Sequence, residues 1–164
     1  MSKLIETIED FAKFRNEKRF EDFIIKNIEI TYWIPDRQHF VDVRFENCKF
    51  IGGENTFLGS IFKNVSFLEC ELDGVLFNGA GLNNSRFANS TLKKCQFERV
   101  MWNGVKFYNN TIEDCDFSGQ MMIGCGFEYG TFKRNNVEGL KHRETGSFFE
   151  NVDYSGNYGT MKKI

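Results

Sequence analysis

The sequence predicts an all-β solenoid, in which the chain winds in stacked coils around one continuous interior. Three observations predict it: a large apolar residue returns at every fifth position, a small residue mostly stands two places before it, and glycine or asparagine often stands two places after it. A helix would repeat every 3.6 residues and a half-exposed strand every 2, so neither produces this period. A short fixed repeat of this kind is typical of a solenoid.

The large apolar residues continue without interruption over residues 57–137. They are Phe57, Phe62, Phe67, Leu72, Phe77, Leu82, Phe87, Leu92, Phe97, Trp102, Phe107, Ile112, Phe117, Met122, Phe127, Phe132 and Val137. With four repeats to a coil, every fourth one should lie in the same column of stacked side chains. The column expected to form the structural core consists of Phe67, Phe87, Phe107 and Phe127. The bulk of these rings excludes a ligand channel through the interior.

The small positions hold all the cysteines of the chain, which are Cys48, Cys70, Cys95, Cys115 and Cys125. This placement explains them as small apolar wall residues, and no spacing among them fits a zinc site. The glycines and asparagines that follow tolerate the tight turn or positive φ of a corner. Four corners close a square coil of about twenty residues, and such coils stack at a strand spacing of about 4.8 Å.

This pattern resembles the pentapeptide-repeat family, in which Ala, Cys, Ser, Thr or Val precedes a central Leu or Phe by two residues. The match covers residues 40–139. The resemblance implies a right-handed quadrilateral β-helix, here of about five to six coils. It implies little about function, because members of the family do different work on one scaffold.

The first segment, residues 1–17, differs from the repeats. Leu4, Ile8 and Phe11 form an apolar stripe at helical spacing. A short amphipathic helix is a common cover for the open strand edges at the end of a solenoid. We therefore expect an N-terminal capping helix, and a membrane-bound or partner-binding helix is the alternative.

Three further segments follow. Residues 18–39 are expected to form a degenerate first coil that is broken at Pro35. Residues 40–139 form the pentapeptide-repeat β-helix, with a two-residue slip in register at 52–55. Residues 140–164 should form a loop, a partial last coil and a C-terminal tail.

The composition and the motifs argue against several classes of function. The chain has 21 basic and 23 acidic residues and a net charge of −2, so neither direct nucleic-acid binding nor a DNA-like acidic surface is expected. His39 and His142 lie far apart, and no catalytic or phosphate-binding motif occurs. We therefore expect no enzyme activity, no cofactor, and no catalytic, cofactor-binding or metal-ligating residues.

The sequence also predicts a cellular location. No apolar run is long enough to cross a bilayer, and the N-terminus carries acids where a signal peptide would be apolar. An odd number of cysteines suits a reducing compartment. We expect a bacterial, cytoplasmic protein that does not contact a membrane.

Charged residues should alternate in sign along one side of the solenoid. These residues are Glu71 and Asp73, Lys93 and Lys94, Glu113 and Asp114, and Lys133 and Arg134. Opposite charges on neighbouring strands stabilise their pairing by about 0.2–1 kcal/mol each. This side should therefore satisfy its own charges, whereas an imitation of DNA needs charge of one sign.

Another side combines apolar residues with neutral polar ones. The expected partner surface consists of Ile61, Met101, Met121 and Ile123, with Tyr108 and Tyr129 on the adjoining side. Interfaces favour Met and Tyr, although exposed apolar residues that are merely scattered are ordinary. The sequence thus predicts a non-enzymatic scaffold whose partner is another protein, or a second copy in a homodimer.

The resemblance adds two finer expectations about function. Some members of the family are immunity or self-protection factors, which bind a toxin or the target of a toxin. The alternative is a protector of a type II topoisomerase, the role of quinolone-resistance members that imitate duplex DNA. The net charge of −2 disfavours this alternative.

Overall fold

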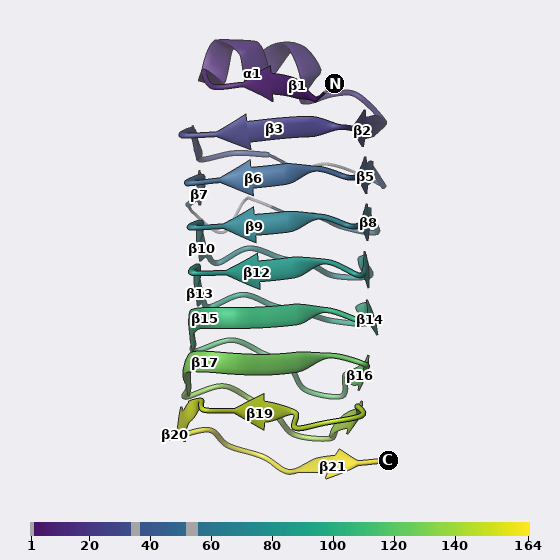
Figure 1. The fold of residues 1–164 in the computed structure, drawn as a ribbon, viewed down its shortest axis with the longest axis vertical. Coiled ribbons are helices and arrows are strands. Elements are labelled where there is room, and N and C mark those ends of the chain that lie inside the picture. The colour runs from purple at the N-terminus through teal and green to yellow at the C-terminus, as the bar shows by residue number, and fades with distance from the viewer. Residues whose placement is uncertain (1, 34–36, 52–55) are drawn as a thin grey trace.

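The computed structural model describes residues 2–33, 37–51 and 56–164. The chain winds as a right-handed β-helix with four sides, and its coils stack along one axis (Figure 1). Within the described residues the first side holds eight strands, so the count of about five to six coils is corrected to about eight. The expected break at Pro35 and the expected slip at 52–55 lie outside the described residues.

The additional coils come from both ends of the chain. Phe20 pairs with Phe40, and the central residues on the other two strands of that coil pair in the same way with the coil below. These end coils keep the large apolar residues but lose much of the small and glycine pattern. Because register depends on the buried large residues, the coils form although the repeat is degenerate.

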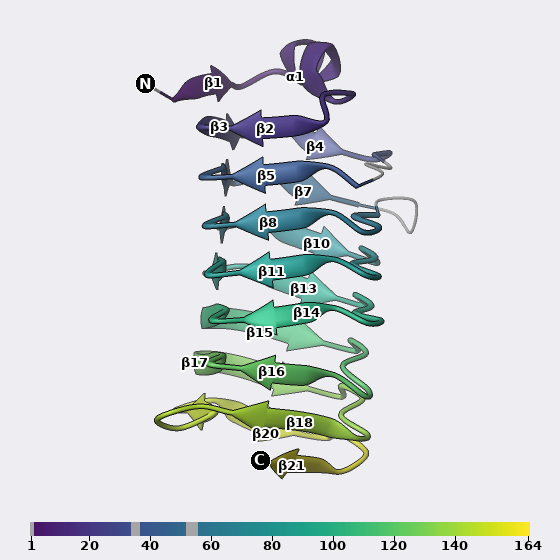
Figure 2. The same cartoon turned by 90° about the vertical axis from the view of Figure 1, so that its right-hand side faces the viewer.

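The first side is an 8-stranded parallel sheet within the described residues, and it faces the viewer in Figure 2. Its strands are β2 (Arg19–Glu21), β5 (His39–Val41), β8 (Ile61–Lys63), β11 (Gly81–Asn83), β14 (Met101–Asn103), β16 (Met121–Ile123), β18 (Leu140–Arg143) and β21 (Met161–Lys163). The middle residue of each three-residue strand points inward, and its two neighbours point outward.

The second and third sides share one sheet, which has 13 strands among the described residues. The second side consists of β1 (Lys3–Ile5), β3 (Phe23–Lys26), β6 (Arg44–Glu46), β9 (Ser66–Leu68), β12 (Arg86–Ala88), the first halves of β15 (Lys106–Glu113) and β17 (Gly126–Lys133), and β19 (Phe149–Glu150). The third side consists of β4 (Glu29–Ile30), β7 (Lys49–Phe50), β10 (Glu71–Asp73), β13 (Thr91–Lys93), the second halves of β15 and β17, and β20 (Asp153–Ser155). On the fourth side, single bridges join Thr56, Leu76, Gln96, Asp116, Asn136 and Tyr158.

The interior consists of columns of aromatic and aliphatic side chains. In the column behind the second side, ring centroids lie 4.8 Å apart for Phe67 and Phe87, and 5.0 Å apart for Phe87 and Phe107. Phe107 and Phe127 follow at 4.4 Å, and all four rings are buried and nearly parallel. Such stacking fills the core and leaves no channel along this column.

Two asparagines stand where the repeat expects a small residue, and hydrogen bonds explain both. Asn110 Oδ1 accepts a bond from the Ser90 backbone N–H at 2.9 Å, and Asn110 Nδ2 donates to the Phe87 carbonyl at 2.9 Å. Asn135 makes the equivalent pair of bonds at the next corner. The buried amides thus satisfy backbone groups of the coil above, which would otherwise be unpaired.

The N-terminal end is covered by β1 and by the helix α1 (Ile8–Phe14). Phe11 is buried against Trp33, with ring centroids 4.8 Å apart. Leu4, expected on the helical stripe, lies instead in β1, where it pairs with Ile24 and is 52% exposed. The chain fills the free edge of β3 with a strand first, and Thr7 begins the helix by accepting a bond from the Asp10 N–H at 3.1 Å.

The C-terminal end has no helix among the described residues, and a polar network ends the interior instead. His142 follows Met122 in the inward column of the first side. The Glu144 carboxylate lies 2.7 Å from His142 Nδ1 and 2.7 Å from Lys163 Nζ, and its side chain is only 6% exposed. Tyr154 and Tyr158 remain exposed near this end.

Candidate protein-binding surface

The outward face of the first side carries the largest exposed apolar residues of the β-helix strands. Met101 is 64% exposed, Met121 48% and Ile61 37%. Ile61 opposes Gly81 on the next strand, and Gly81 opposes Met101, so these residues lie in one column along the solenoid axis. The sheet itself therefore aligns the three apolar side chains.

Gly81 makes this column continuous. A Cβ atom on Gly81 would meet Met101 Cε at 3.4 Å, which shows that the methionine side chain lies over the glycine. Gly81 is buried by this contact, although its position points outward. The column thus presents a low apolar strip from Ile61 to Met121.

A second outward column runs beside this strip and is neutral along its middle. It contains Lys63, Asn83, Asn103, Ile123 and Arg143, in chain order from β8 to β18. Ile123 is half-buried and lines a groove of about 420 Å³ whose other wall is the loop 144–147. A flat apolar strip therefore ends beside a shallow groove.

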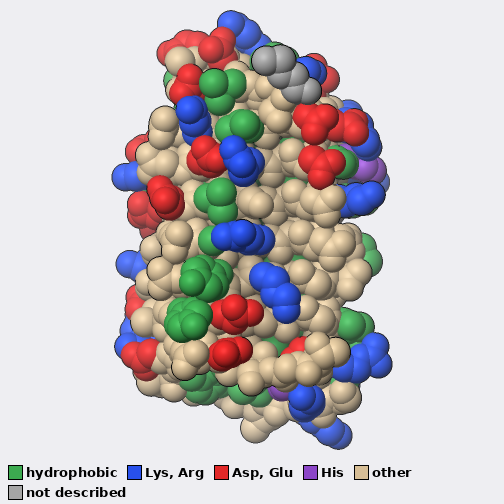
Figure 3. Space-filling model, in the orientation of Figure 1, with side chains coloured by type: hydrophobic (Ala, Val, Ile, Leu, Met, Phe, Trp, Pro, Cys, Tyr) green, Lys and Arg blue, Asp and Glu red, His purple; other side chains and the backbone are tan. Residues whose placement is uncertain are grey.

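Tyr108 and Tyr129 lie away from this strip, toward the third side. They are 43% and 48% exposed, and their rings meet edge to face with centroids 5.5 Å apart. Tyr108 lines a groove of about 400 Å³ with Arg86, Lys106 and Glu128. Figure 3 shows this second side, where hydrophobic, basic and acidic side chains are mixed.

The six residues of the expected partner surface thus fall into two clusters. Ile61, Met101, Met121 and Ile123 lie together on the first side, and the two tyrosines lie across the second side from them. The two grooves share Lys106 and Glu128 as lining residues, so they join the clusters around one corner.

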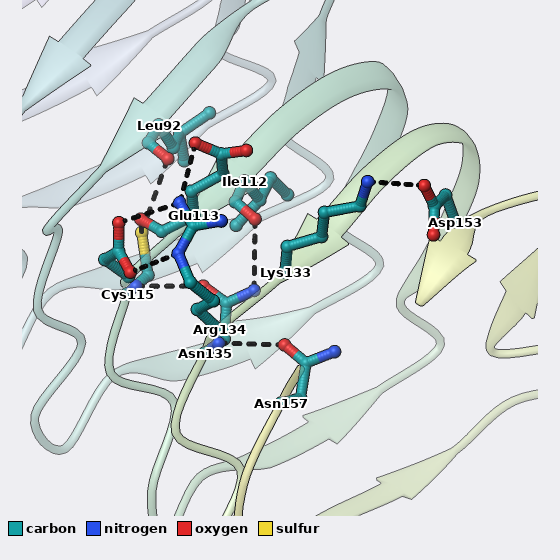
Figure 4. A network of polar contacts seen from close by, with 10 residues as sticks. Leu92, Ile112, Glu113, Cys115, Lys133, Arg134, Asn135, Asp153 and Asn157 are labelled. Carbon is teal, nitrogen blue, oxygen red and sulfur yellow. Dashed lines mark hydrogen bonds and ion pairs between the residues drawn. The ribbon is translucent and has the colours of Figure 1, made fainter. Parts of the chain in front are cut away.

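The third side carries the expected alternation of charge, which is confirmed by the strand register. Asp73 opposes Lys93, Lys93 opposes Glu113, and Glu113 opposes Lys133. Arg134 extends the pattern, with its Nη2 3.0 Å from Glu113 and its Nε 2.9 Å from Asp114 (Figure 4). The hydrogen bond from Arg134 lowers the pKa of the Asp114 carboxyl, which keeps the pair charged.

The cysteines offer no reactive thiolate. All five are free and buried. Burial raises the pKa of the Cys125 thiol to about 11 and raises that of Cys95 as well. At neutral pH these two thiols therefore stay protonated, and a thiol is a far weaker nucleophile or metal ligand than a thiolate.

Other chemical groups were also searched within the described part of the chain. No cluster of three or more His, Cys, Asp or Glu side chains there could hold a metal ion. His39 is exposed on the first side, whereas His142 is buried against the Phe148 ring at 4.1 Å between centroids. No helix in the same residues is long and apolar enough to span a membrane.

The structure adds residues that the sequence pattern missed. Lys141 opposes Met121, and Lys162 opposes Lys141, so the apolar column ends in two lysines. Lys141 follows Met121 by one full coil, a step that would have placed it. Lys162 follows only after the register has shifted in the loop 144–148, which no five-residue count detects.

Comparison with known proteins agrees with this architecture. The family described as "Pentapeptide repeat region" matches residues 38–117. No sequence among curated proteins matches the chain. The matched residues lie in the middle coils, where the repeat is most regular.

Three solved structures are similar in fold. A trypsin-treated form of QnrB1, a plasmid-mediated fluoroquinolone resistance protein, is 12% identical, with a TM-score of 0.51 over 86% of this chain and 85% of that one. Rfr23 from the cyanobacterium Cyanothece 51142 is 8% identical, with a TM-score of 0.31 over 93% and 98%. HetL from Nostoc sp. strain PCC 7120, a protein involved in heterocyst differentiation regulation, is 8% identical, with a TM-score of 0.26 over 94% and 92%.

Proposed function

Since the repeat region of this chain belongs to the pentapeptide-repeat family, we propose that the protein is a non-enzymatic scaffold that binds another protein through its first side. The apolar strip of Ile61, Met101 and Met121 forms the centre of the contact. Tyr108 and Tyr129 extend the contact around the corner when the partner is large enough to reach them.

The observation that carries this proposal is the exposure of Met101, which is 64% in the middle of a flat sheet. Parallel sheets are usually covered on both faces, yet here the outer face is open at its most apolar point. Methionine is enriched in interface cores, and it adapts its shape to a partner. The neutral neighbours Asn83 and Asn103 place no charge beside the strip that would have to be desolvated.

The biological setting that fits this scaffold is immunity or self-protection, in which a rigid surface captures a toxin or covers its target. A second copy of the chain is the alternative occupant. About 800 Å² per partner is buried in a standard interface, so a homodimer would need the groove and the tyrosines in addition to the strip.

The test is a double substitution, Met101→Lys with Met121→Glu, which leaves the net charge unchanged. Both side chains point outward, so the fold should persist. We expect proteins from the native host that crosslink to the wild type to be lost from the variant, or a dimer to become a monomer in sedimentation.

The matched control is Thr91→Lys with Thr111→Glu. These threonines oppose each other on the third side and are half-buried, so the control adds the same charges in the same geometry. The control should retain every partner. If Met101→Lys with Met121→Glu also retains every partner and the same mass in solution, the first side is not the binding surface.

Protection of a type II topoisomerase is the second candidate function. It is favoured by the similarity in fold to QnrB1, a fluoroquinolone resistance protein. The net charge of −2 and the alternating charges of the third side oppose a DNA-like surface. A gyrase supercoiling assay with a quinolone decides it: relief of inhibition by this protein supports the candidate, and unchanged inhibition at a large excess of protein excludes it.

A further inference from the structure

The cations of the first side differ from those of the third side in having no partners. Lys63, Lys141 and Lys162 are exposed, and none of them forms an ion pair within the described residues. Arg19, at the other end of the side, is paired with Glu21 at 2.8 Å. Between β8 and β21 the described outward positions of this side hold no acid.

The arrangement of Lys141 and Lys162 is itself unfavourable for the fold. The two lysines oppose each other on neighbouring strands, and like charges in that position destabilise a sheet. On the third side the same position alternates in sign, as Lys93 opposes Glu113 and Glu113 opposes Lys133. The repeat can therefore balance its charges, and on the first side it does not.

The lysines continue the apolar strip in the same column. Met121 opposes Lys141 directly, and Arg143 follows Ile123 in the neighbouring column. Arg143 also lines the groove that contains Glu128 and Glu150, so part of its charge is balanced there. The uncompensated positive charge therefore concentrates at Lys141 and Lys162, at one end of the strip.

The length of the strip indicates the shape of its occupant. From Ile61 to Lys162 there are five strand spacings of about 4.8 Å, or roughly 24 Å. A helix of about sixteen residues has this length, and its pitch of about 5.4 Å nearly matches the row spacing. An extended chain repeats its side chains every ~6.8 Å on one face and would fall out of step with the rows.

We propose that the partner segment is an acidic amphipathic helix, lying along the solenoid axis. Its apolar face packs on Ile61, Met101 and Met121, and its carboxylates lie against Lys141 and Lys162. This inference rests on the proposed function, because it assigns the chemistry of the partner to the same surface. Charge complementarity of this kind raises the association rate and selects partners by sign.

The experiment uses the full chain and two synthetic peptide probes of about sixteen residues, the length derived above. Both probes carry leucine at helical spacing on one face, and the other face is glutamate in one probe and lysine in the other. Fluorescence anisotropy should show the glutamate peptide binding about tenfold more tightly than the lysine peptide. Lys141→Glu with Lys162→Glu should reverse the preference.

The control for net charge is Lys13→Glu with Lys94→Glu, which makes the same change far from the first side. Lys13 lies on α1, and Lys94 lies at the corner beyond the third side. This control should keep the preference for the glutamate peptide. Equal weakening by the control, or tighter binding of a short DNA duplex than of the glutamate peptide, overturns the proposal.

Failure of this inference can be distinguished from failure of the proposed function. If both peptides bind equally and Met101→Lys with Met121→Glu abolishes both, the surface is correct and its preference for acidic partners is wrong. If neither peptide responds to the methionine substitutions, the surface itself is wrong.

Discussion

The first and third sides of this β-helix are built on the same interior, but their outward residues follow different rules. The third side places opposite charges on neighbouring strands, as at Lys93 and Glu113. The first side places methionines and glycine in its middle and two facing lysines at its end. Both sides face away from the same core, so burial does not explain the difference.

This contrast separates what holds the fold from what is free to serve another purpose. Inward residues fix the coil and its register, and they are apolar on both sides. The outward residues of the third side add to the stability of the sheet, whereas those of the first side do not. A surface that leaves available stabilisation unused is a candidate for binding.

The largest expected effect comes from the interior that both sides share. Phe107→Ala should lower the free energy of unfolding by about 3–5 kcal/mol, because it removes a stacked ring and leaves a cavity. Urea denaturation followed by circular dichroism measures this loss. Asn84→Gly is the control, since glycine already occupies the equivalent corner at Gly104 with φ 66; equal stability of Phe107→Ala and wild type would show that Phe107 does not pack the core.

The sharpest test of the comparison reverses one charge on each side. Arg134→Glu should lower the melting temperature, because it places three acids where Arg134 now pairs with Glu113 and Asp114. Lys141→Glu should raise the melting temperature slightly, because it replaces a repulsion from Lys162 with an attraction. Both shifts should shrink in concentrated salt. Shifts of the same sign at low salt would contradict the contrast between the sides.

The pH dependence of stability should belong to the third side. Arg134 lowers the folded-state pKa of Asp114, and Lys133 lowers that of Asp153. A lowered carboxyl pKa stabilises the fold above the unfolded value of about 3.9 and loses that effect as the pH falls through the folded value. Arg134→Gln should therefore flatten the decline in melting temperature between about pH 5 and pH 2. An unchanged decline would mean that the Asp114 pair does not contribute.

The smallest effect on stability is expected on the first side. Met101→Lys with Met121→Glu should change the free energy of unfolding by no more than about 0.5 kcal/mol, because both side chains are exposed. Thermal and urea denaturation measure it. A loss of several kcal/mol would show that the strip stabilises the fold, and its exposure could then not be attributed to binding.

The sequence predicted the class of fold because one five-residue pattern decides both the inward and the corner positions. It underestimated the coils at the ends, where Phe20 and Ile25 keep the register without the small and glycine residues. It also merged β1 with the helix, because Leu4 and Ile8 fit a helical stripe equally well. The backbone edge of β3 decides that choice, and no side-chain pattern records it.

The site was predicted in part, since a step of twenty residues places Met101 below Gly81 and Met121 below Met101. The lysines at the end of the strip escaped the count. The loop 144–148 changes the step between Lys141 and Lys162, and only the paired strands show that they face each other. Tyr108 and Tyr129 were placed on an adjoining side, but their distance from the strip depends on a corner whose width the sequence does not define.

The stacking of coils also determines how this molecule would respond to force. Each strand bonds to the strands about twenty residues before and after it, so a pull on the two ends opens one coil at a time. Twenty residues extend to roughly 68 Å and occupied about 4.8 Å along the axis, so each opening event should lengthen the chain by roughly 63 Å. The protein would then behave as a ratchet of equal steps, beginning at the C-terminal end, where β19, β20 and β21 each hold to one neighbour only.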